Sequence, residues 1–306
     1  MTDDRDVDAA LVADVDALAL REKALADAQP HPEAVVVEQD VHENTLVADD
    51  AAFPNAPFSV YGDAIRSMWS EPDSSDVQVR GATYLADQVK VPSGDALGKL
   101  LHVDVLNVAD VEDRHHIALQ EEKRPHSVLK YCREAFPDSM VFILNMELPN
   151  AEHTCIVSYW LLPRLRDAVS DTEHDPKKNF QRLLWSFCNA EDDAFRTQRF
   201  KLIPDFQNAP WVFQTLVPSR PVLSGNKLTQ HYFRRHNYFE LDLDIASSTA
   251  ATYIGSLCCS WATYLDVQIF ITIQGEAADE LPERVIGGVS FKYLDISLAE
   301  TIEQQQ

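Results

Sequence analysis

Short segments rich in β-branched and aromatic residues recur along the chain from Phe53 onward, separated by turns rich in Pro, Gly and Asp. This pattern is typical of β-strands. Eight segments fit it, at residues 77–84, 101–108, 140–148, 155–162, 211–217, 238–245, 265–273 and 288–296.

Three segments have helical periodicity instead, at residues 127–136, 176–188 and 247–264. The last is the strongest, because Ser247 or Ser248 can cap it and apolar residues recur at spacings of four and three. In that helix one face carries Ala250, Ile254, Leu257, Trp261 and Tyr264. In segment 176–188 the residues expected to face inward are Phe180, Leu183, Leu184 and Phe187.

Alternation along two strands separates their faces. In segment 238–245, Phe239, Leu241, Leu243 and Ile245 lie on one side, and Glu240, Asp242 and Asp244 lie on the other. Because successive side chains of a strand point to opposite faces, this segment should have a core face and an acidic polar face. Segment 265–273 is expected to turn Leu265, Val267, Ile269, Ile271 and Ile273 inward.

The helices do not alternate strictly with the strands, and no glycine-rich strand-to-helix turn is present. We therefore predict an α+β fold: a largely antiparallel β-sheet of about eight strands with packed helices, in a single domain. Residues 238–273 fit one strand–helix–strand crossover unit.

The N-terminal 51 residues differ in composition from the rest. They contain 14 acidic and three basic residues and no aromatic side chain, so they cannot bury enough apolar surface to offset their ordering entropy. We predict a disordered acidic arm at 1–51, a domain at 52–299 and a tail at 300–306. The arm is either a solvated tail or an autoinhibitory strap over the basic residues named below, and a short helix over 9–28 fits its sequence.

Composition narrows the function classes. The net charge of −23 opposes attraction to nucleic acid, and no apolar run approaches the length of a membrane span. The acidic first residues do not resemble a signal peptide, and five cysteines without a CxxC pair indicate neither disulfides nor zinc. These features predict a cytoplasmic protein that is not secreted.

Four segments carry a resemblance to a known family. The first is WSEP…VRGATYL at residues 69–72 and 79–85, and the second is DDAFR…RFKLIP at 192–196 and 199–204. The third is YFELDLDI…SS at 238–245 and 247–248, and the fourth is LPER…IG at 281–284 and 286–287. In this order they are similar to the C-terminal domain of the plant protein ENHANCED DISEASE RESISTANCE 2, a domain of unknown function. In its plant namesakes that domain follows a pleckstrin-homology domain and a START domain, whereas here the acidic arm precedes it. The resemblance implies a module of membrane-associated, lipid-linked regulators without established chemistry.

Positive charge is concentrated in a few places of this acidic chain. The candidates for binding an anion or a lipid headgroup are Arg80, Arg196, Arg199, Lys201, Arg234 and Arg235. The alternative is that these cations pair with Glu240, Asp242 and Asp244 in a structural charge network.

Helix 247–264 is expected to close the sheet over an apolar pocket, with Ile254, Leu257 and Trp261 as lining residues. The predicted function is a non-catalytic lipid- or anion-binding regulatory module that contacts membranes as a peripheral protein. The alternative is a protein-interaction or scaffold domain without a small-molecule ligand. In either case the acidic arm is a candidate contact for a protein partner.

The sequence predicts no enzyme, cofactor or metal. The motifs GxSxG, GxxxxGK[ST], HExxH and GxGxxG are absent. Glu240, Asp242 and Asp244 could hold Ca²⁺ or Mg²⁺, but no loop of EF-hand spacing completes such a site. His115 and His116 are expected to be a solvated loop pair. His102 and Asp104 share a strand face and could form an acid–base pair, but no nucleophile accompanies them.

Overall fold

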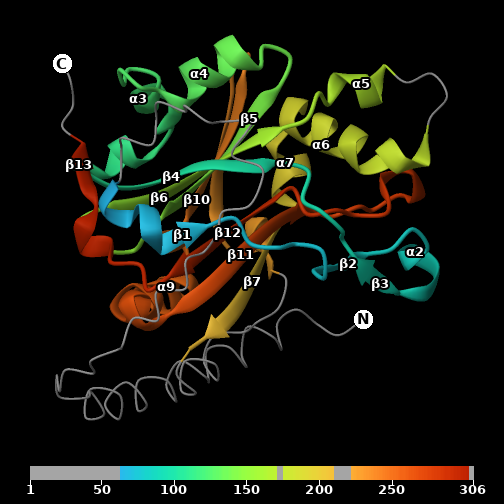
Figure 1. The fold of residues 1–306 in the computed structure, drawn as a ribbon. Helices are drawn as coiled ribbons and strands as arrows, with labels where there is room; N and C mark the ends of the chain where they lie inside the picture. Colours follow the sequence, from blue (N-terminus) through green and yellow to red (C-terminus); the bar gives the residue numbers. More distant parts are fainter. Residues whose placement is uncertain (1–62, 171–174, 210–221, 303–306) are drawn as a thin grey trace. The chain divides into compact units, whose positions relative to one another are not determined.

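The computed structural model describes residues 63–170, 175–209 and 222–302, and Figure 1 shows their arrangement. The predicted arm 1–51 and the predicted strand 211–217 lie outside the described residues. Residues Glu300–Ile302, predicted as part of a tail, form the short strand β13.

A six-stranded sheet forms the larger layer. Its strands, in spatial order, are β13, β4 (Lys99–Val108), β6 (Thr154–Leu162), β5 (Met140–Glu147), β10 (Tyr238–Asp244) and β9 (Thr229–Arg234). Strand β10 runs parallel to β5 and β13 runs parallel to β4, whereas the other neighbouring pairs are antiparallel. The parallel β5–β10 pair places residues distant in sequence at the same end of the sheet.

A five-stranded antiparallel sheet forms the second layer. Its strands, in spatial order, are β1 (Trp69–Ser70), β12 (Gly287–Lys292), β11 (Asp266–Ile273), β7 (Phe200–Asn208) and β8 (Val222–Leu223). A separate hairpin consists of β2 (Gln78–Arg80) and β3 (Lys90–Pro92), with the short helix α2 (Tyr84–Asp87) between them.

One apolar core joins the two sheets. Phe142, Trp160 and Phe239 come from the six-stranded sheet, and Ile271 and Val289 come from the five-stranded sheet, all fully buried in one cluster. The core face predicted for 238–245 is confirmed, because Phe239, Leu241 and Leu243 belong to this cluster. The α+β class with largely antiparallel strands is likewise confirmed.

All three predicted helices are present. They correspond to α4 (Val128–Ala135), α6 (Asn179–Asn189) and α9 (Thr249–Trp261). Further short helices are α3 (Ala118–Glu121), α5 (Arg166–Val169), α7 (Asp193–Thr197) and the 3₁₀ turn η4 (Val111–Arg114). The four residues of α6 predicted to face inward are all buried in the core.

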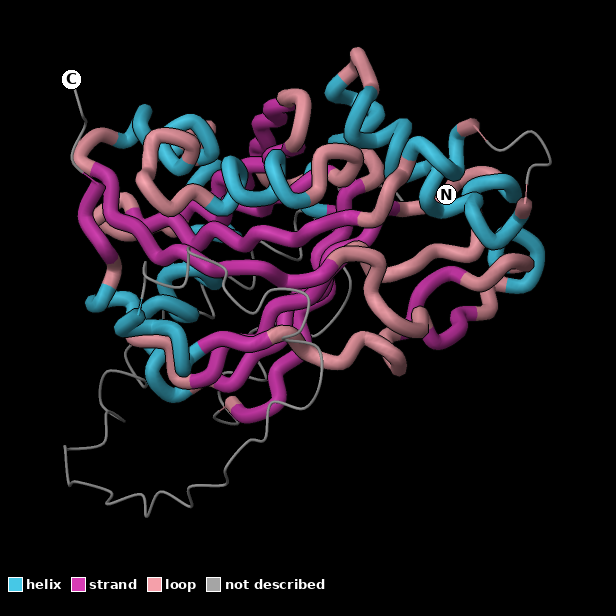
Figure 2. Tube along the Cα trace, turned by 45° about the horizontal axis from the view of Figure 1, so that its top comes forward, coloured by secondary structure: helices cyan, strands magenta, loops and turns pink. Residues whose placement is uncertain are grey.

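Residues 109–136, which connect β4 to β5 and contain η4, α3 and α4, are called the covering segment. In Figures 1 and 2 its helices lie along the side of the six-stranded sheet that faces away from the five-stranded sheet. The six-stranded sheet is therefore covered on both faces.

Two expectations about topology are wrong. Residues 238–273 do not form a crossover within one sheet, because β10 belongs to the six-stranded sheet and β11 to the five-stranded one. The strand predicted at 77–84 ends at Arg80, and α2 follows. Strands β7 and β9 escaped prediction, because Pro204 interrupts the first and polar residues dominate the second.

Candidate functional site

The outer face of the six-stranded sheet, which is turned toward the covering segment, carries four buried carboxylates. They are Asp104 on β4, Glu147 on β5, and Glu240 and Asp242 on β10, each at most 2% exposed. The alternation along β10 was predicted correctly, but its acidic face is not solvent-exposed at Glu240 and Asp242. The covering segment lies over these carboxylates and supplies polar partners to each of them, beside partners on the sheet itself.

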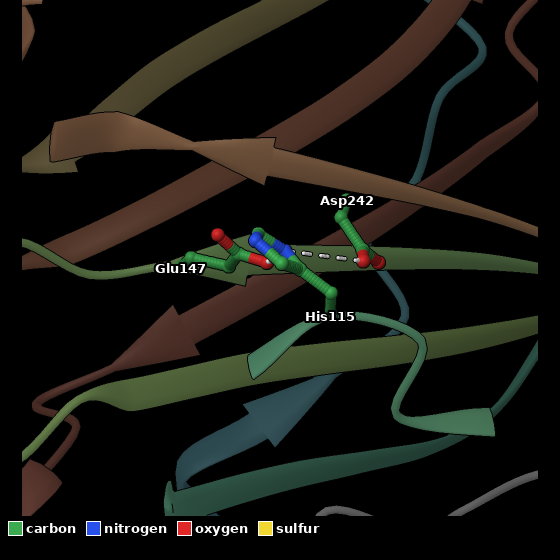
Figure 3. Close-up of side chains that lie close together, drawn as sticks. All are labelled: His115, Glu147 and Asp242. Atoms are coloured by element: carbon green, nitrogen blue, oxygen red, sulfur yellow. Dashed lines mark hydrogen bonds and ion pairs between the residues drawn. The ribbon is translucent and has the colours of Figure 1, made fainter. Parts of the chain in front are cut away.

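His115 lies between two of these carboxylates, as Figure 3 shows. Its Nδ1 is 2.6 Å from Glu147 Oε1 and 3.8 Å from Asp242 Oδ2. The imidazole side chain is 27% exposed, whereas both carboxylates are fully buried. The expectation that His115 belongs to a solvated loop pair is therefore wrong, because it reaches from the covering segment to the sheet.

The surroundings of this group are polar but incompletely paired. Asn145 Nδ2 donates to Asp242 Oδ1 at 3.2 Å, and Arg114 Nη2 lies 3.9 Å from Glu147 Oε2. Glu147 Oε2 and Asn145 Oδ1 are buried without a hydrogen-bond partner among the described residues. Burial raises the pKa of Asp242 to about 8, with a contribution from the charge of Glu147, and burial also raises the pKa of Glu147.

His116 connects the covering segment to β10. Its backbone N–H donates to Asp242 Oδ2 at 2.8 Å, and its Nε2 lies 2.9 Å from the Tyr238 hydroxyl. The imidazole stacks on Phe233 at 4.1 Å between ring centroids. Burial, together with the charge of Arg235, lowers the pKa of His116 to about 4, so the ring is neutral near pH 7. His116 is therefore a structural contact rather than a solvated side chain.

Asp104 is the centre of a second group on the same face. His102 Nε2 is 3.1 Å from Asp104 Oδ1, Arg124 Nη1 donates to Oδ2 at 2.8 Å, and the Tyr159 hydroxyl donates to Oδ2 at 2.9 Å. The predicted pairing of His102 with Asp104 is confirmed. Burial by itself would raise the pKa of Asp104, but His102, Arg124 and Tyr159 together hold it well below its usual range.

We expect Asp104 to make folding stability depend on pH in the acid range. Because the pKa of Asp104 is lower in the folded chain than in the unfolded chain, where it is about 3.9, its contribution is fully present above that value and is lost as pH falls below it. In Asp104→Asn the acid-range loss of stability should be smaller than in the wild type. Chemical unfolding of both proteins at several values between about pH 2 and 7 tests this window. Equal slopes in the two proteins would contradict the expectation.

A pocket of about 230 Å³ opens at another part of the fold, next to the edge where β9 ends and β5 begins. Helices α5 and α6 lie side by side there (Figure 1). The residues that line the pocket are Pro137, Asp138, Ser139, Met140, Pro163, Leu165, Arg166, Trp185, Arg234 and His236.

Two arginines make this pocket basic. Arg234 Nη1 donates to the Tyr238 carbonyl at 3.0 Å, while its Nε is buried and has no hydrogen-bond partner within the described ranges. The Arg166 guanidinium lies 5.8 Å from the ring centre of Trp185. Burial lowers the pKa of Arg234, and the like charge of Arg166 adds to this effect. The one carboxylate in the lining, Asp138, pairs with Arg164 at 2.9 Å.

Arg80 and Lys201, two of the predicted cationic candidates, converge on one buried carboxylate. Lys201 Nζ lies 2.7 Å from both oxygens of Glu283, and Arg80 Nε lies 3.7 Å from Oε1. Glu283 also accepts the Gly275 N–H at 2.9 Å. These two cations are therefore engaged within the fold.

The remaining candidates differ in their surroundings. Arg196 pairs with Asp193 at 2.5 Å and donates to the Phe187 carbonyl, whereas Arg199 pairs with Glu276 at 3.0 Å. Four of the six candidates therefore pair with other acids, and among the described residues none of the six forms an ion pair with Glu240, Asp242 or Asp244, as the predicted charge network required. Of the six candidates only Arg234 lines the pocket, and Arg235 beside it is exposed.

Ile254, Leu257 and Trp261, the predicted lining of an apolar pocket, are half-buried on α9. They pack with Phe206, Ala209 and Leu265 in a small cluster of their own and do not line the pocket at Arg234.

Several residues of these two sites were not predicted from the sequence. Glu147, Arg166, Trp185 and His236 carry no local motif, and only the fold brings them beside their partners. One signal was available for Glu147: it is an acidic residue at the end of a strand whose other residues, except Asn145, are apolar, and a charge there needs a partner.

Comparison with known proteins agrees with the family resemblance of the four sequence segments. The family described as Protein ENHANCED DISEASE RESISTANCE 2, C-terminal, matches residues 69–295. A protein from Arabidopsis thaliana named "Protein ENHANCED DISEASE RESISTANCE 2-like" is 30% identical over 234 residues, which are 76% of this chain and 30% of that protein. The chain thus spans about a third of the relative's length, and no solved structure matches. Within the described residues, no helix is both long and apolar enough to cross a bilayer.

Proposed function

The chain belongs to the ENHANCED DISEASE RESISTANCE 2 C-terminal family. We propose that it is a non-catalytic regulatory module that binds an anionic group, the phosphate of a lipid headgroup, at a membrane surface. The ligand site is the pocket that Arg166, Arg234 and His236 line.

One observation carries the proposal: two guanidinium groups line the same pocket, and neither has a carboxylate partner among the residues described. Most other arginines of the candidate set are paired with acids. Two neighbouring unpaired cations repel one another, and a bound anion removes that repulsion. Arginine also suits phosphate, since its planar fork can donate two parallel hydrogen bonds.

The size of the pocket limits what it can hold. Pockets for drug-sized ligands measure about 300–1,000 Å³, so a volume of about 230 Å³ suits a headgroup phosphate but not a whole lipid. The acyl chains of a bound lipid would then remain in the bilayer. Because the chain carries a net charge of −23, this contact must be local and is favoured when salt screens the rest of the surface.

We expect Arg234→Gln and Arg166→Gln to weaken anion binding by about 10–100-fold, since a charge-assisted hydrogen bond contributes about 1.5–3 kcal/mol. Titration calorimetry of the full chain with inorganic phosphate measures the site itself. Flotation with phosphatidylcholine vesicles, with and without phosphatidic acid, measures the membrane contact.

Arg235→Gln is the matched control, because Arg235 is the adjacent arginine, is exposed and does not line the pocket. It should bind like the wild type. If Arg234→Gln and Arg166→Gln are folded and bind phosphate and vesicles as tightly as the wild type, the proposal is wrong. Binding of phosphate without binding of vesicles would instead identify a soluble anion as the ligand source.

A further inference from the structure

We propose that His115, Glu147 and Asp242 form a binding site for a divalent transition-metal ion, with zinc(II) as the best-suited cation. The site lies on the outer face of the six-stranded sheet and shares no residue with the pocket of Arg166 and Arg234.

Three separate parts of the chain supply the ligands. His115 follows η4 in the covering segment, Glu147 ends β5, and Asp242 lies on β10. Strands β5 and β10 are parallel neighbours with Asp242 beside Asn145, so Glu147 and Asp242 face the same side two positions apart. One ligand atom from each of the three residues lies within 4.8 Å of the others. A small inward movement of these side chains would surround a single ion.

Unpaired buried atoms at the same place indicate that a partner is missing. Glu147 is fully buried, and its Oε2 has no hydrogen-bond donor in the part of the chain that is described. The nearest cation, Arg114 Nη2, remains 3.9 Å away. Asn145 lies directly opposite Asp242 on the neighbouring strand, and its Oδ1 is also buried without a partner among the described residues. Buried polar atoms are normally satisfied, and a metal ion bound by both oxygens of Glu147 would satisfy Oε2.

The local charge balance points the same way. Glu147, Glu240 and Asp242 are three fully buried carboxylates on adjacent strands. Arg114 and the His115 imidazole are the bases near Glu147, and Arg114 is beyond hydrogen-bond distance. A divalent cation bound here would take the place of the protons that burial favours on these carboxylates.

The ligand types favour zinc over calcium or magnesium. Zinc accepts imidazole nitrogen together with carboxylate oxygen, whereas calcium and magnesium prefer oxygen ligands alone. The ring of His231 lies 4.4 Å from the ring of His115 between centroids, which places a second imidazole beside the three ligands. The 27% exposure of His115 provides access from solvent. The calcium or magnesium set of Glu240, Asp242 and Asp244 is not the set that the fold gathers.

Metal binding would replace the hydrogen bond between His115 Nδ1 and Glu147 Oε1, which are 2.6 Å apart. For both atoms to donate a lone pair to the ion, the neutral ring would carry its proton on Nε2, and any additional proton on the ring or on the Glu147 carboxyl would be released to solvent. Zinc affinity should therefore fall as pH falls.

Titration calorimetry of the chelator-treated full chain with zinc(II) tests the proposal. We expect one ion per chain in the wild type and at least about tenfold weaker binding in His115→Gln and Glu147→Gln. His126→Gln is the matched control, because His126 is an exposed histidine of the same covering segment. It should bind zinc like the wild type.

Two further measurements make the result decisive. Cys258 and Cys259, two neighbouring half-buried thiols, are the competing metal site. A cobalt(II) complex with thiolate ligands has a thiolate-to-metal charge-transfer band, so this band should be absent if the ligands are nitrogen and oxygen. Thermal unfolding of each variant without metal shows whether weaker zinc binding comes from the lost ligand or from a lost fold. His115→Gln should keep the fold, because the side chain that it replaces is partly exposed. Unchanged zinc affinity in folded His115→Gln and Glu147→Gln, or a thiolate band in the wild type, would overturn the proposal.

Discussion

Replacing Glu283 by alanine is expected to lower the free energy of unfolding by about 3–5 kcal/mol, because it leaves a buried ammonium group without its counter-charge. Glu283 is 1% exposed and Lys201 is 7% exposed, with Nζ 2.7 Å from both carboxylate oxygens. Burial already lowers the pKa of Lys201, and Glu283 opposes that effect. The backbone N–H groups of Gly275 and Arg80 would also lose their acceptor.

Glu276→Ala is the control for this prediction. Glu276 also pairs with an arginine, Arg199 at 3.0 Å, but its side chain is 42% exposed. An ion pair with an exposed carboxylate contributes at most about 1 kcal/mol, and Glu280 stays 3.8 Å from the same guanidinium, so this variant should unfold close to the wild type. Chemical denaturation of the three proteins measures both values. If Glu283→Ala and Glu276→Ala lose similar amounts of unfolding free energy, burial of the ion pair does not determine its contribution.

Trp160→Ala is also expected to cost about 3–5 kcal/mol of unfolding free energy, because it removes the largest buried side chain between the two sheets. The indole is fully buried, and its Nε1 donates to the Gly288 carbonyl on β12 at 3.0 Å. A Cβ at Gly287 would meet the indole at 2.6 Å, so β12 can approach this closely only with glycine there. Trp160 thus connects β6 of one sheet to β12 of the other.

Unfolding followed by near-UV and far-UV circular dichroism measures this effect. Because both sheets share one core, both signals should shift together in a single transition. Trp261→Ala is the control, since Trp261 is half-buried in the separate small cluster at α9, and its loss should be less than half as large. Two separate transitions, with only one of them shifted, would contradict the shared core.

Variants at the two sites should differ in their effects on folding stability. The pocket at Arg234 lies at the edge of the six-stranded sheet and is open to solvent, so variants there should alter binding more than stability. The carboxylates under the covering segment are buried within the domain, so each variant there needs a measurement of folding beside that of binding.

The sequence by itself determined the class of most elements and the faces of the central ones. Alternation with a period of two identified Phe239, Leu241 and Leu243 as core residues, and helical spacing identified the buried face of α6, because both patterns follow from backbone geometry within one segment. The pairing of His102 with Asp104 was also local, since residues two apart on a strand share a face. The family resemblance rested on short motifs and needed no coordinates.

Only the tertiary structure decided which polar residues meet. Whether Glu240 and Asp242 face water depends on the covering segment, which lies more than 100 residues earlier in the chain and leaves no trace in the local pattern. The pairing of Lys201 with Glu283, and the placement of Arg166 beside Arg234, likewise join distant segments. The physical reason is that periodicity gives the direction of a side chain relative to its own strand or helix, whereas its partner, burial and charge state depend on what packs against it.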